Sequence, residues 1–196
     1  MRQAGAMPDV LRWLIVANCV AFLFELGGGA ATVAVFALWP LHGGFMPWQL
    51  FSYAFLHASL LHLAVNMFGL WMFGRELASR LGAVRFLRLY GVSVLSAGAM
   101  QVLVTSLADS VYPTVGASGG VFGLLLAYAL FFPNRIVLLL FPPIPMPAWL
   151  FVTLYALLEL ALGVTGSEEG VAHFAHLGGM VGSYLLLRHW LRQARR

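Results

Sequence analysis

The 196-residue sequence is 61% hydrophobic and only 9% charged, against roughly 25% charged residues in a typical soluble domain. This composition excludes an ordinary soluble globular protein and predicts a membrane protein. The net charge of +4 comes from Arg residues at the ends of apolar runs, which indicates membrane topology rather than nucleic-acid binding. No hydrophilic stretch is long enough for a separate soluble domain, so we expect one membrane domain over residues 1–196.

Six apolar runs are long enough, at roughly 17–25 residues each, to cross a bilayer as helices. They lie at about residues 10–26, 50–73, 84–107, 115–132, 147–164 and 171–190. The first is expected to be a retained span rather than a cleaved signal peptide. The stretch Ala30–Trp39 is too short to cross and is interpreted as an interfacial or re-entrant element. The predicted fold is therefore an all-α polytopic bundle of six transmembrane helices.

Arginine placement predicts the orientation of these spans. All eleven Arg residues fall at or before the start of span one, between spans two and three, between four and five, or after six. The loops on the opposite side, at residues 27–49, 108–114 and 165–170, contain none. Positively charged loops stay in the cytoplasm, so both termini are expected there. The sequence uses Arg and no Lys and is rich in Gly, Ala and Leu, which further suggests a bacterial protein. We therefore expect it in the lipid bilayer of a bacterial inner membrane.

Polar side chains interrupt three of the predicted spans, where such groups are costly and commonly functional. Span two contains His62 and Asn66, which share a helix face because they are four residues apart. Span four begins with "VGASGGVFG", whose one hydroxyl belongs to Ser118, and span six contains His173 and His176. All three spans run inward from the outer side, so the polar groups are expected in one layer near the outer surface.

The glycines around these residues predict that spans four and six approach closely. Each span contains a small-xxx-small pattern: Gly119 with Gly123, and Gly178 with Gly182. Contact between those two faces would bring Ser118 within reach of His176. A serine hydroxyl becomes an effective nucleophile when a neighbouring imidazole removes its proton. We therefore expect Ser118 to be a nucleophile and His176 its general base.

Nucleophilic attack also requires hydrogen-bond donors for the oxyanion that forms. The side chains of His62 and Asn66 and the backbone N–H of Ser118 are the candidates. Phe122, one turn after Ser118, is expected to pack against the imidazole ring. Three glycines are expected to support the site: Gly116, Gly119 and Gly179.

The remaining ionisable residues suggest a dyad without a metal. No Asp or Glu is obviously placed to orient His176, so a dyad rather than a triad is predicted. Glu159 in span five is expected to make a buried structural hydrogen bond. A zinc or copper site built from the histidines is an alternative, but no carboxylate or thiolate accompanies them and no H-E-x-x-H motif is present. Neither a metal nor another cofactor is expected. Ordinary helix packing and interhelical hydrogen bonds would also account for these polar residues, without catalysis.

These motifs resemble those of the rhomboid intramembrane serine proteases, in particular bacterial six-span members. The resemblance covers about Trp48 to Gly182 and rests on "GASGGVFG", "HASLLHLAVN" and "AHLGGMVG", with "PWQLFSYAFLH" and "FGRELASRLG" beside them. It implies Ser118 as nucleophile, His176 as base, and an oxyanion hole of His62, Asn66 and the Ser118 N–H. It also implies transmembrane proteins as substrates, cleaved near the outer membrane face.

Two positions depart from the family pattern. Gln49 stands where many members have Arg, which removes an Arg contact that anchors the first loop, and Ala78 stands where a Glu is common. Two other functions remain open: a catalytically inactive rhomboid-like binder of membrane helices, and a His-lined transporter or metal-handling protein. The sequence carries no indication of an oligomeric state.

Overall fold

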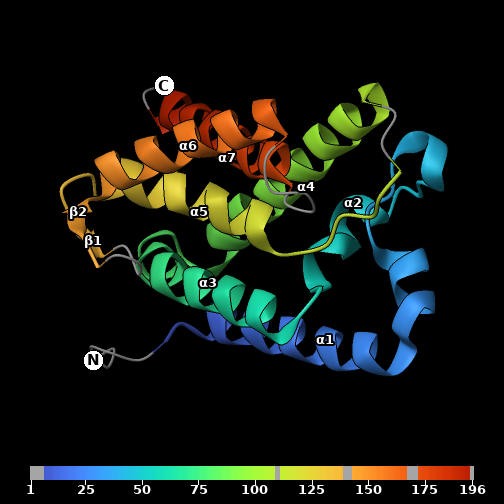
Figure 1. Ribbon diagram of the computed structural model, residues 1–196. Helices are drawn as coiled ribbons and strands as arrows, with labels where there is room; N and C mark the ends of the chain where they lie inside the picture. Colours follow the sequence, from blue (N-terminus) through green and yellow to red (C-terminus); the bar gives the residue numbers. More distant parts are fainter. Residues whose placement is uncertain (1–6, 109–110, 139–142, 167–171, 195–196) are drawn as a thin grey trace.

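The computed structural model describes residues 7–108, 111–138, 143–166 and 172–194. This part of the chain is an all-α bundle with one small hairpin (Figure 1). Its α-helices are α1 (Asp9–Phe36), α2 (Gln49–Ser52), α3 (Leu60–Leu81), α4 (Ala83–Leu107), α5 (Ser118–Phe131), α6 (Ala148–Thr165) and α7 (His173–Ala194). Two 3₁₀ turns, η1 (Leu41–Gly43) and η2 (Tyr53–Phe55), and two strands, β1 (Ile136–Leu138) and β2 (Pro145–Pro147), complete it.

The predicted class, an all-α membrane protein, is confirmed. Helices α1, α4 and α6 are each long and apolar enough to cross a membrane, and the bent pair of 49–55 with α3 adds a fourth candidate span. Helix α5 is apolar but has only 14 residues, about 21 Å of helix against a hydrocarbon layer of roughly 30 Å. Length and composition therefore identify three or four spans among the described residues, not the full predicted set of six.

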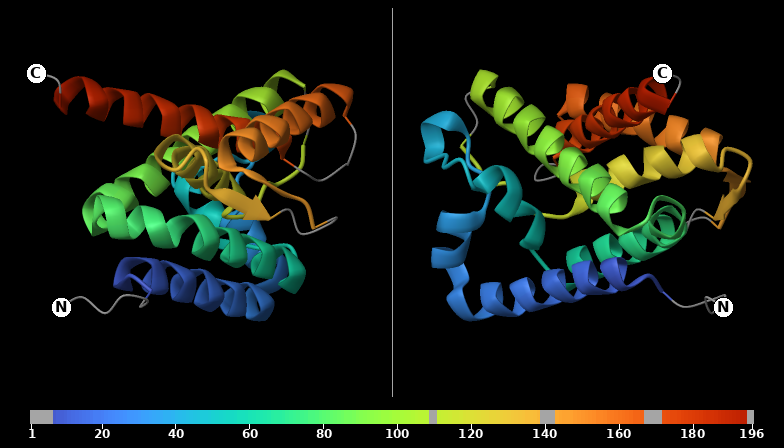
Figure 2. Two further views of the ribbon diagram at one scale, coloured as in Figure 1. Left: turned by 90° about the vertical axis from the view of Figure 1, so that its left-hand side faces the viewer. Right: turned by 180° about the vertical axis from the view of Figure 1, so that it is seen from behind.

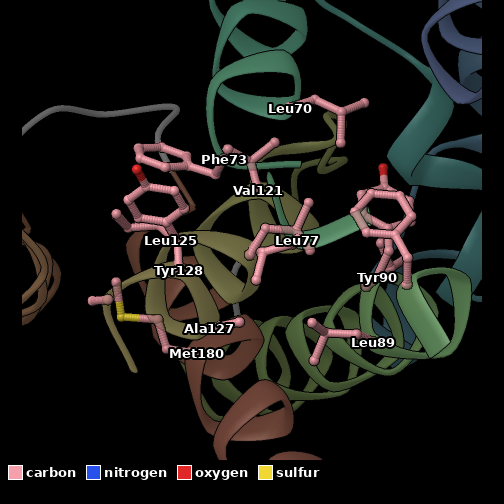
Figure 3. Close-up of a cluster of buried hydrophobic side chains, with 14 of the residues drawn as sticks. Leu70, Phe73, Leu77, Leu89, Tyr90, Val121, Leu125, Ala127, Tyr128 and Met180 are labelled. Carbon is pink, nitrogen blue, oxygen red and sulfur yellow. The ribbon is translucent and has the colours of Figure 1, made fainter. Parts of the chain in front are cut away.

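The bundle surrounds α5, which packs against α3, α4, α6 and α7. Figure 2 shows α1 along one side of the molecule beside α3, with α6 and α7 on the opposite side. Buried side chains from α3, α4, α5 and α7 meet in the cluster of Figure 3. Helix α1 begins, and α7 ends, on the same side of the bundle as the β1–β2 hairpin (Figure 1). The residues around the start of α5 are buried, namely Gly116, Ala117, Gly119 and Gly120, and Ser118 between them is half-buried.

The predicted second span, residues 50–73, has the wrong boundaries. The chain turns by 100° between the short helical segment 49–55 and α3. Ser59 has an extended backbone, and its hydroxyl accepts the backbone N–H of His62 at 3.1 Å, so it caps α3 at its first turn. Because the apolar run continues through Ser59, hydropathy alone does not indicate that a helix begins here. Helix α3 then continues to Leu81.

The predicted fourth span, residues 115–132, is likewise shorter than expected. Gly116 has a φ of +127°, a conformation that side chains rarely adopt, and the helix begins only at Ser118. As the first helical residue, Ser118 has a backbone N–H with no acceptor inside the helix. That N–H is therefore available to another acceptor.

The start of the chain combines two predicted elements into one bent helix. Helix α1 runs through the expected first span and continues to Phe36, with a kink at Gly29, whose φ is +51°. The stretch from Ala30 is thus the last part of α1 after the kink, seen in Figure 1 as a sharp change of direction. The β1–β2 hairpin between α5 and α6 was not predicted; there Ile136 pairs with Pro147 in an antiparallel register.

Gln49 anchors the first loop in place of an Arg. Its side chain is fully buried. The Oε1 atom accepts the backbone N–H groups of Trp39 at 3.3 Å and Met46 at 3.0 Å, and Nε2 donates to the carbonyl of Val35 at 3.2 Å. The expected loss of a loop contact at this position is therefore offset by three neutral hydrogen bonds. Ala78, the second departure, is buried in the hydrophobic cluster.

Candidate active site

Ser118 and His176 are brought together by the crossing of α5 and α7. The Oγ atom of Ser118 lies 2.8 Å from Nε2 of His176, although the two residues are 58 positions apart. His176 is buried and Ser118 is half-buried. This is the distance at which a neutral imidazole nitrogen accepts a hydroxyl proton.

The α5–α7 crossing depends on a glycine contact different from the predicted one. A Cβ on Gly179 would collide with the backbone carbonyl of Gly119, and a Cβ on Gly123 would lie 2.9 Å from the carbonyl oxygen of Gly179. Gly178 and Gly182 instead face α4, where Cβ atoms would meet the backbone carbonyls of 96 and 92 at 2.9 and 3.0 Å. The predicted close approach is present, but Gly178 and Gly182 bring α7 against α4, and Gly179 brings it against α5.

The imidazole of His176 is held flat against an aromatic ring. The ring centroids of Phe122 and His176 are 4.2 Å apart and their planes differ by only 4°. Tyr155 of α6 packs against Phe122, with the centroids of these two rings 6.0 Å apart. The stack restricts rotation of the imidazole and so keeps Nε2 directed at Ser118.

The predicted oxyanion-hole residues share a cavity with Ser118 and His176. This cavity has a volume of about 690 Å³, and its polar lining includes His62, Asn66, Ser118 and His176. One amide N–H of Asn66 donates to the backbone carbonyl of His62 at 3.0 Å, which leaves its second N–H for another acceptor. A Cβ on Gly116 would lie 2.8 Å from the ring of His62, so the glycine at this position leaves room for that ring.

The rest of the cavity is largely apolar and extends between α3 and α6. Its lining includes Met72 and Phe73 of α3 and Phe151 and Tyr155 of α6. A cavity with an apolar lining and a few polar groups at one place is the usual form of a binding site.

Glu159 makes the buried hydrogen bond expected of it, with His173, but its position beside His176 was not predicted. Its Oε2 atom lies 2.7 Å from Nδ1 of His173 and 2.9 Å from Nδ1 of His176. The expectation that no carboxylate is placed near His176 is therefore wrong, and so is the expectation that none accompanies the histidines. Two features of the sequence could have indicated this contact. Glu159 lies about as far from the outer end of the predicted span 147–164 as His176 does from the outer end of the span 171–190. A lone intramembrane carboxylate is also rarely without a partner.

The same three side chains form the donor set that could hold a metal ion. The ligand atoms of Glu159, His173 and His176 all lie within 4.8 Å of one another, and two His with one Glu is a set known from catalytic zinc sites. Direct contact of the carboxylate with both imidazoles accounts for the cluster without an ion.

Comparison with known proteins identifies the family of this chain. Residues 44–193 match the Rhomboid domain family. The chain is 37% identical over 128 residues to the mitochondrial Rhomboid protein 1 of Saccharomyces cerevisiae, covering 64% of this chain and 37% of the yeast protein. It is 27% identical over 170 residues to Rhomboid protease GluP of Bacillus subtilis, covering 83% of this chain and 31% of the Bacillus protein.

A third relative is Rhomboid protease GlpG of Klebsiella pneumoniae, 30% identical over 92 residues, covering 45% of this chain and 33% of that protein. The chain thus spans about a third of the length of the curated relatives it matches. The family match covers most of the chain and includes every helix from α2 to the greater part of α7. This chain is therefore a member of the rhomboid family, within an all-α membrane protein fold.

Proposed function

We propose that this chain is an intramembrane serine endopeptidase in which Ser118 is the nucleophile and His176 the general base. The observation that carries the proposal is the 2.8 Å contact between Ser118 Oγ and His176 Nε2, inside a cavity bounded by membrane helices. The protease names of two relatives, GluP and GlpG, support the same class of reaction.

The reaction follows from the protonation of these two groups. His176 Nε2 accepts the proton of Ser118 as Oγ attacks a peptide carbonyl carbon, and the carbonyl oxygen becomes an oxyanion. In the proposed reaction, the Ser118 N–H and the side chains of Asn66 and His62 donate hydrogen bonds to that oxyanion. The imidazolium then gives its proton to the leaving nitrogen, and an acyl-enzyme remains on Ser118. Water hydrolyses the ester, with His176 again acting as base.

Transmembrane segments are the proposed substrates. A helix in lipid keeps its carbonyl groups in internal hydrogen bonds, so a segment must unwind before its carbonyls reach Ser118. Helix-breaking residues near the cleaved bond, and small residues at it, should therefore favour cleavage. The apolar cavity lining between α3 and α6 is suited to such a segment entering from the lipid.

We also propose that the chain forms a single membrane domain in a bacterial inner membrane, with both termini in the cytoplasm and the site near the outer face. The start of α1 and the end of α7 lie on one side of the bundle, which supports termini on the same side of the membrane (Figure 1); the Arg distribution supports the cytoplasmic side. Reporter fusions after residues 43 and 194 test it: only the first should carry an active periplasmic reporter, and the opposite pattern would reverse the proposed orientation.

The activity test compares the purified protein with two variants, on a single-span substrate in detergent. Ser118→Ala and His176→Ala should abolish cleavage, and a fluorophosphonate probe should label only proteins that retain Ser118. Ser183→Ala and His189→Ala are matched controls, since Ser183 is buried in α7 away from the cavity and His189 is exposed. Both controls should cleave at the wild-type rate.

Cleavage by Ser118→Ala at the wild-type rate would contradict the proposal. Cleavage that a chelator abolishes would favour a metal held by Glu159, His173 and His176 instead. Binding of the substrate with no cleavage by the wild-type protein, together with no probe labelling, would favour an inactive binder of membrane helices.

A further inference from the structure

The carboxylate of Glu159 requires an explanation, because it is buried in an apolar helix. Glu159 is 6% exposed and lies in the second half of α6, among Leu and Ala residues. Removing a carboxylate from water is costly unless it gains a charged or hydrogen-bonding partner. Both of the contacts described for its Oε2 atom are with histidine nitrogens of α7.

The packing of α6 against α7 holds this carboxylate in place. Gly163, one turn after Glu159, lies so close to α7 that an added Cβ would be 3.0 Å from the ring of Phe174 and 3.2 Å from Cβ of His173. His173 is buried, and its Nδ1 contacts Oε2 of Glu159 at 2.7 Å. His173 thus fixes one side of the carboxylate, which turns Oε2 toward the next histidine along the helix.

The second contact places Glu159 beside the nitrogen of His176 that does not face Ser118. The Nδ1 atom of His176 is buried and lies 2.9 Å from Oε2, but the oxygen is off the direction in which a ring N–H would point. The interaction is therefore mainly electrostatic rather than an aligned hydrogen bond. An adjacent carboxylate favours the tautomer with the proton on Nδ1.

We infer that Glu159, held by His173, positions His176 for catalysis by keeping the proton on Nδ1 and Nε2 free to accept from Ser118. This role rests on the proposed serine protease function. In the attack step, the proton of Ser118 moves to Nε2 and His176 becomes an imidazolium with both nitrogens protonated. Glu159 stays ionised throughout and stabilises that positive charge, so no proton passes to the carboxylate.

Glu159→Gln tests the inference because it keeps the shape of the side chain and removes its charge. We expect kcat to fall about a hundredfold, less than the roughly 10⁴-fold loss found where an aligned triad carboxylate is replaced. KM should change little, and fluorophosphonate labelling of Ser118 should slow in parallel with kcat. A purely structural role would not slow a small probe in a folded protein. Glu159→Asp should recover part of kcat, because it restores the charge.

Glu25→Gln is the matched control. Glu25 is also buried in a membrane helix, and its Oε2 accepts the backbone N–H of His57 at 2.8 Å, a bond that the amide oxygen of Gln can still accept. This variant should keep the wild-type kcat. A kcat for Glu159→Gln within twofold of wild type would overturn the inference, provided that Ser118→Ala is inactive. An active Ser118→Ala would instead overturn the proposed function itself.

A measurement on the unmodified chain tests the role of Glu159 even if Glu159→Gln does not fold. Nitrogen-15 NMR of histidine-labelled protein, with the His176 signals assigned by their loss in His176→Ala, reports which ring nitrogen carries the proton. We expect a protonated Nδ1 and an unprotonated Nε2 at neutral pH. A signal from the opposite tautomer in the wild-type protein would overturn the role of Glu159.

Discussion

Gly179→Ala is the sharpest test of how the fold aligns the site. The added Cβ would collide with the Gly119 carbonyl oxygen and would lie 2.8 Å from its carbon, whereas ordinary contacts begin at 3.4 Å. Helices α5 and α7 would therefore have to separate by at least about 0.6 Å, the difference between these two distances. Because Ser118 is next to Gly119 and His176 is on the facing helix, their 2.8 Å contact would lengthen by a similar amount, out of the range of a good hydrogen bond.

The expected cost of this substitution is large for activity and moderate for stability. A misplacement of about 1 Å commonly costs about a hundredfold in rate, and overpacking costs about 1–3 kcal/mol. Cleavage of a single-span substrate gives kcat/KM, and unfolding in a mixed-detergent titration gives the free energy of unfolding. Gly91→Ala is the control, since a Cβ on Gly91 of α4 would meet nothing within 4 Å. Wild-type kcat/KM for Gly179→Ala would refute the reasoning.

Three further substitutions probe the ring stack, the loop before α5 and the first loop. Phe122→Leu removes a stack worth about 0.5–1.5 kcal/mol, so kcat should fall roughly two- to tenfold while a fluorophosphonate still labels Ser118; an unaltered kcat would exclude a role for the stack. Gly116→Ala forces a side chain into a φ of +127° and against the His62 ring, and should lower kcat/KM at least about tenfold, whereas full activity would show that the loop adapts. Gln49→Ala removes three hydrogen bonds and should lower the free energy of unfolding by about 1–3 kcal/mol, measured as above; no change would mean that water replaces them.

Hydropathy located the helices whose ends coincide with a change in composition. Helix α4 begins at Ala83 and α6 at Ala148, each within a residue of the prediction. The starts of α3 and α5 were missed because the apolar runs continue past them. There the boundary is set by local backbone features: the hydroxyl of Ser59 and the positive φ of Gly116. Mean hydropathy carries no information about either.

The proximity of Ser118 to His176 followed from the polar residues and glycines, but the details of contact did not. Gly178, Gly179 and Gly182 occupy one small-residue stretch, and only the rotation of α7 about its axis decides which of them meets α5. The position of Glu159 beside His176 was missed for a related reason, because its partners lie across the α6–α7 connection, and spacing along one helix cannot show them. Pairings between helices depend on tertiary packing, which single-sequence patterns describe only in part.

The shortness of α5 has a consequence for how activity depends on the thickness of the bilayer. With its C-terminal end at one boundary of a hydrocarbon layer of roughly 30 Å, a helix of about 21 Å leaves Ser118 about 9 Å below the other. Because the other helices surround α5, water has to cover this depth through the protein to reach Ser118, and a thinner hydrocarbon layer makes the depth smaller. The rate of cleavage should then depend on acyl-chain length: reconstitution in thin bilayers shortens the path of hydrolytic water to Ser118, and thick bilayers lengthen it.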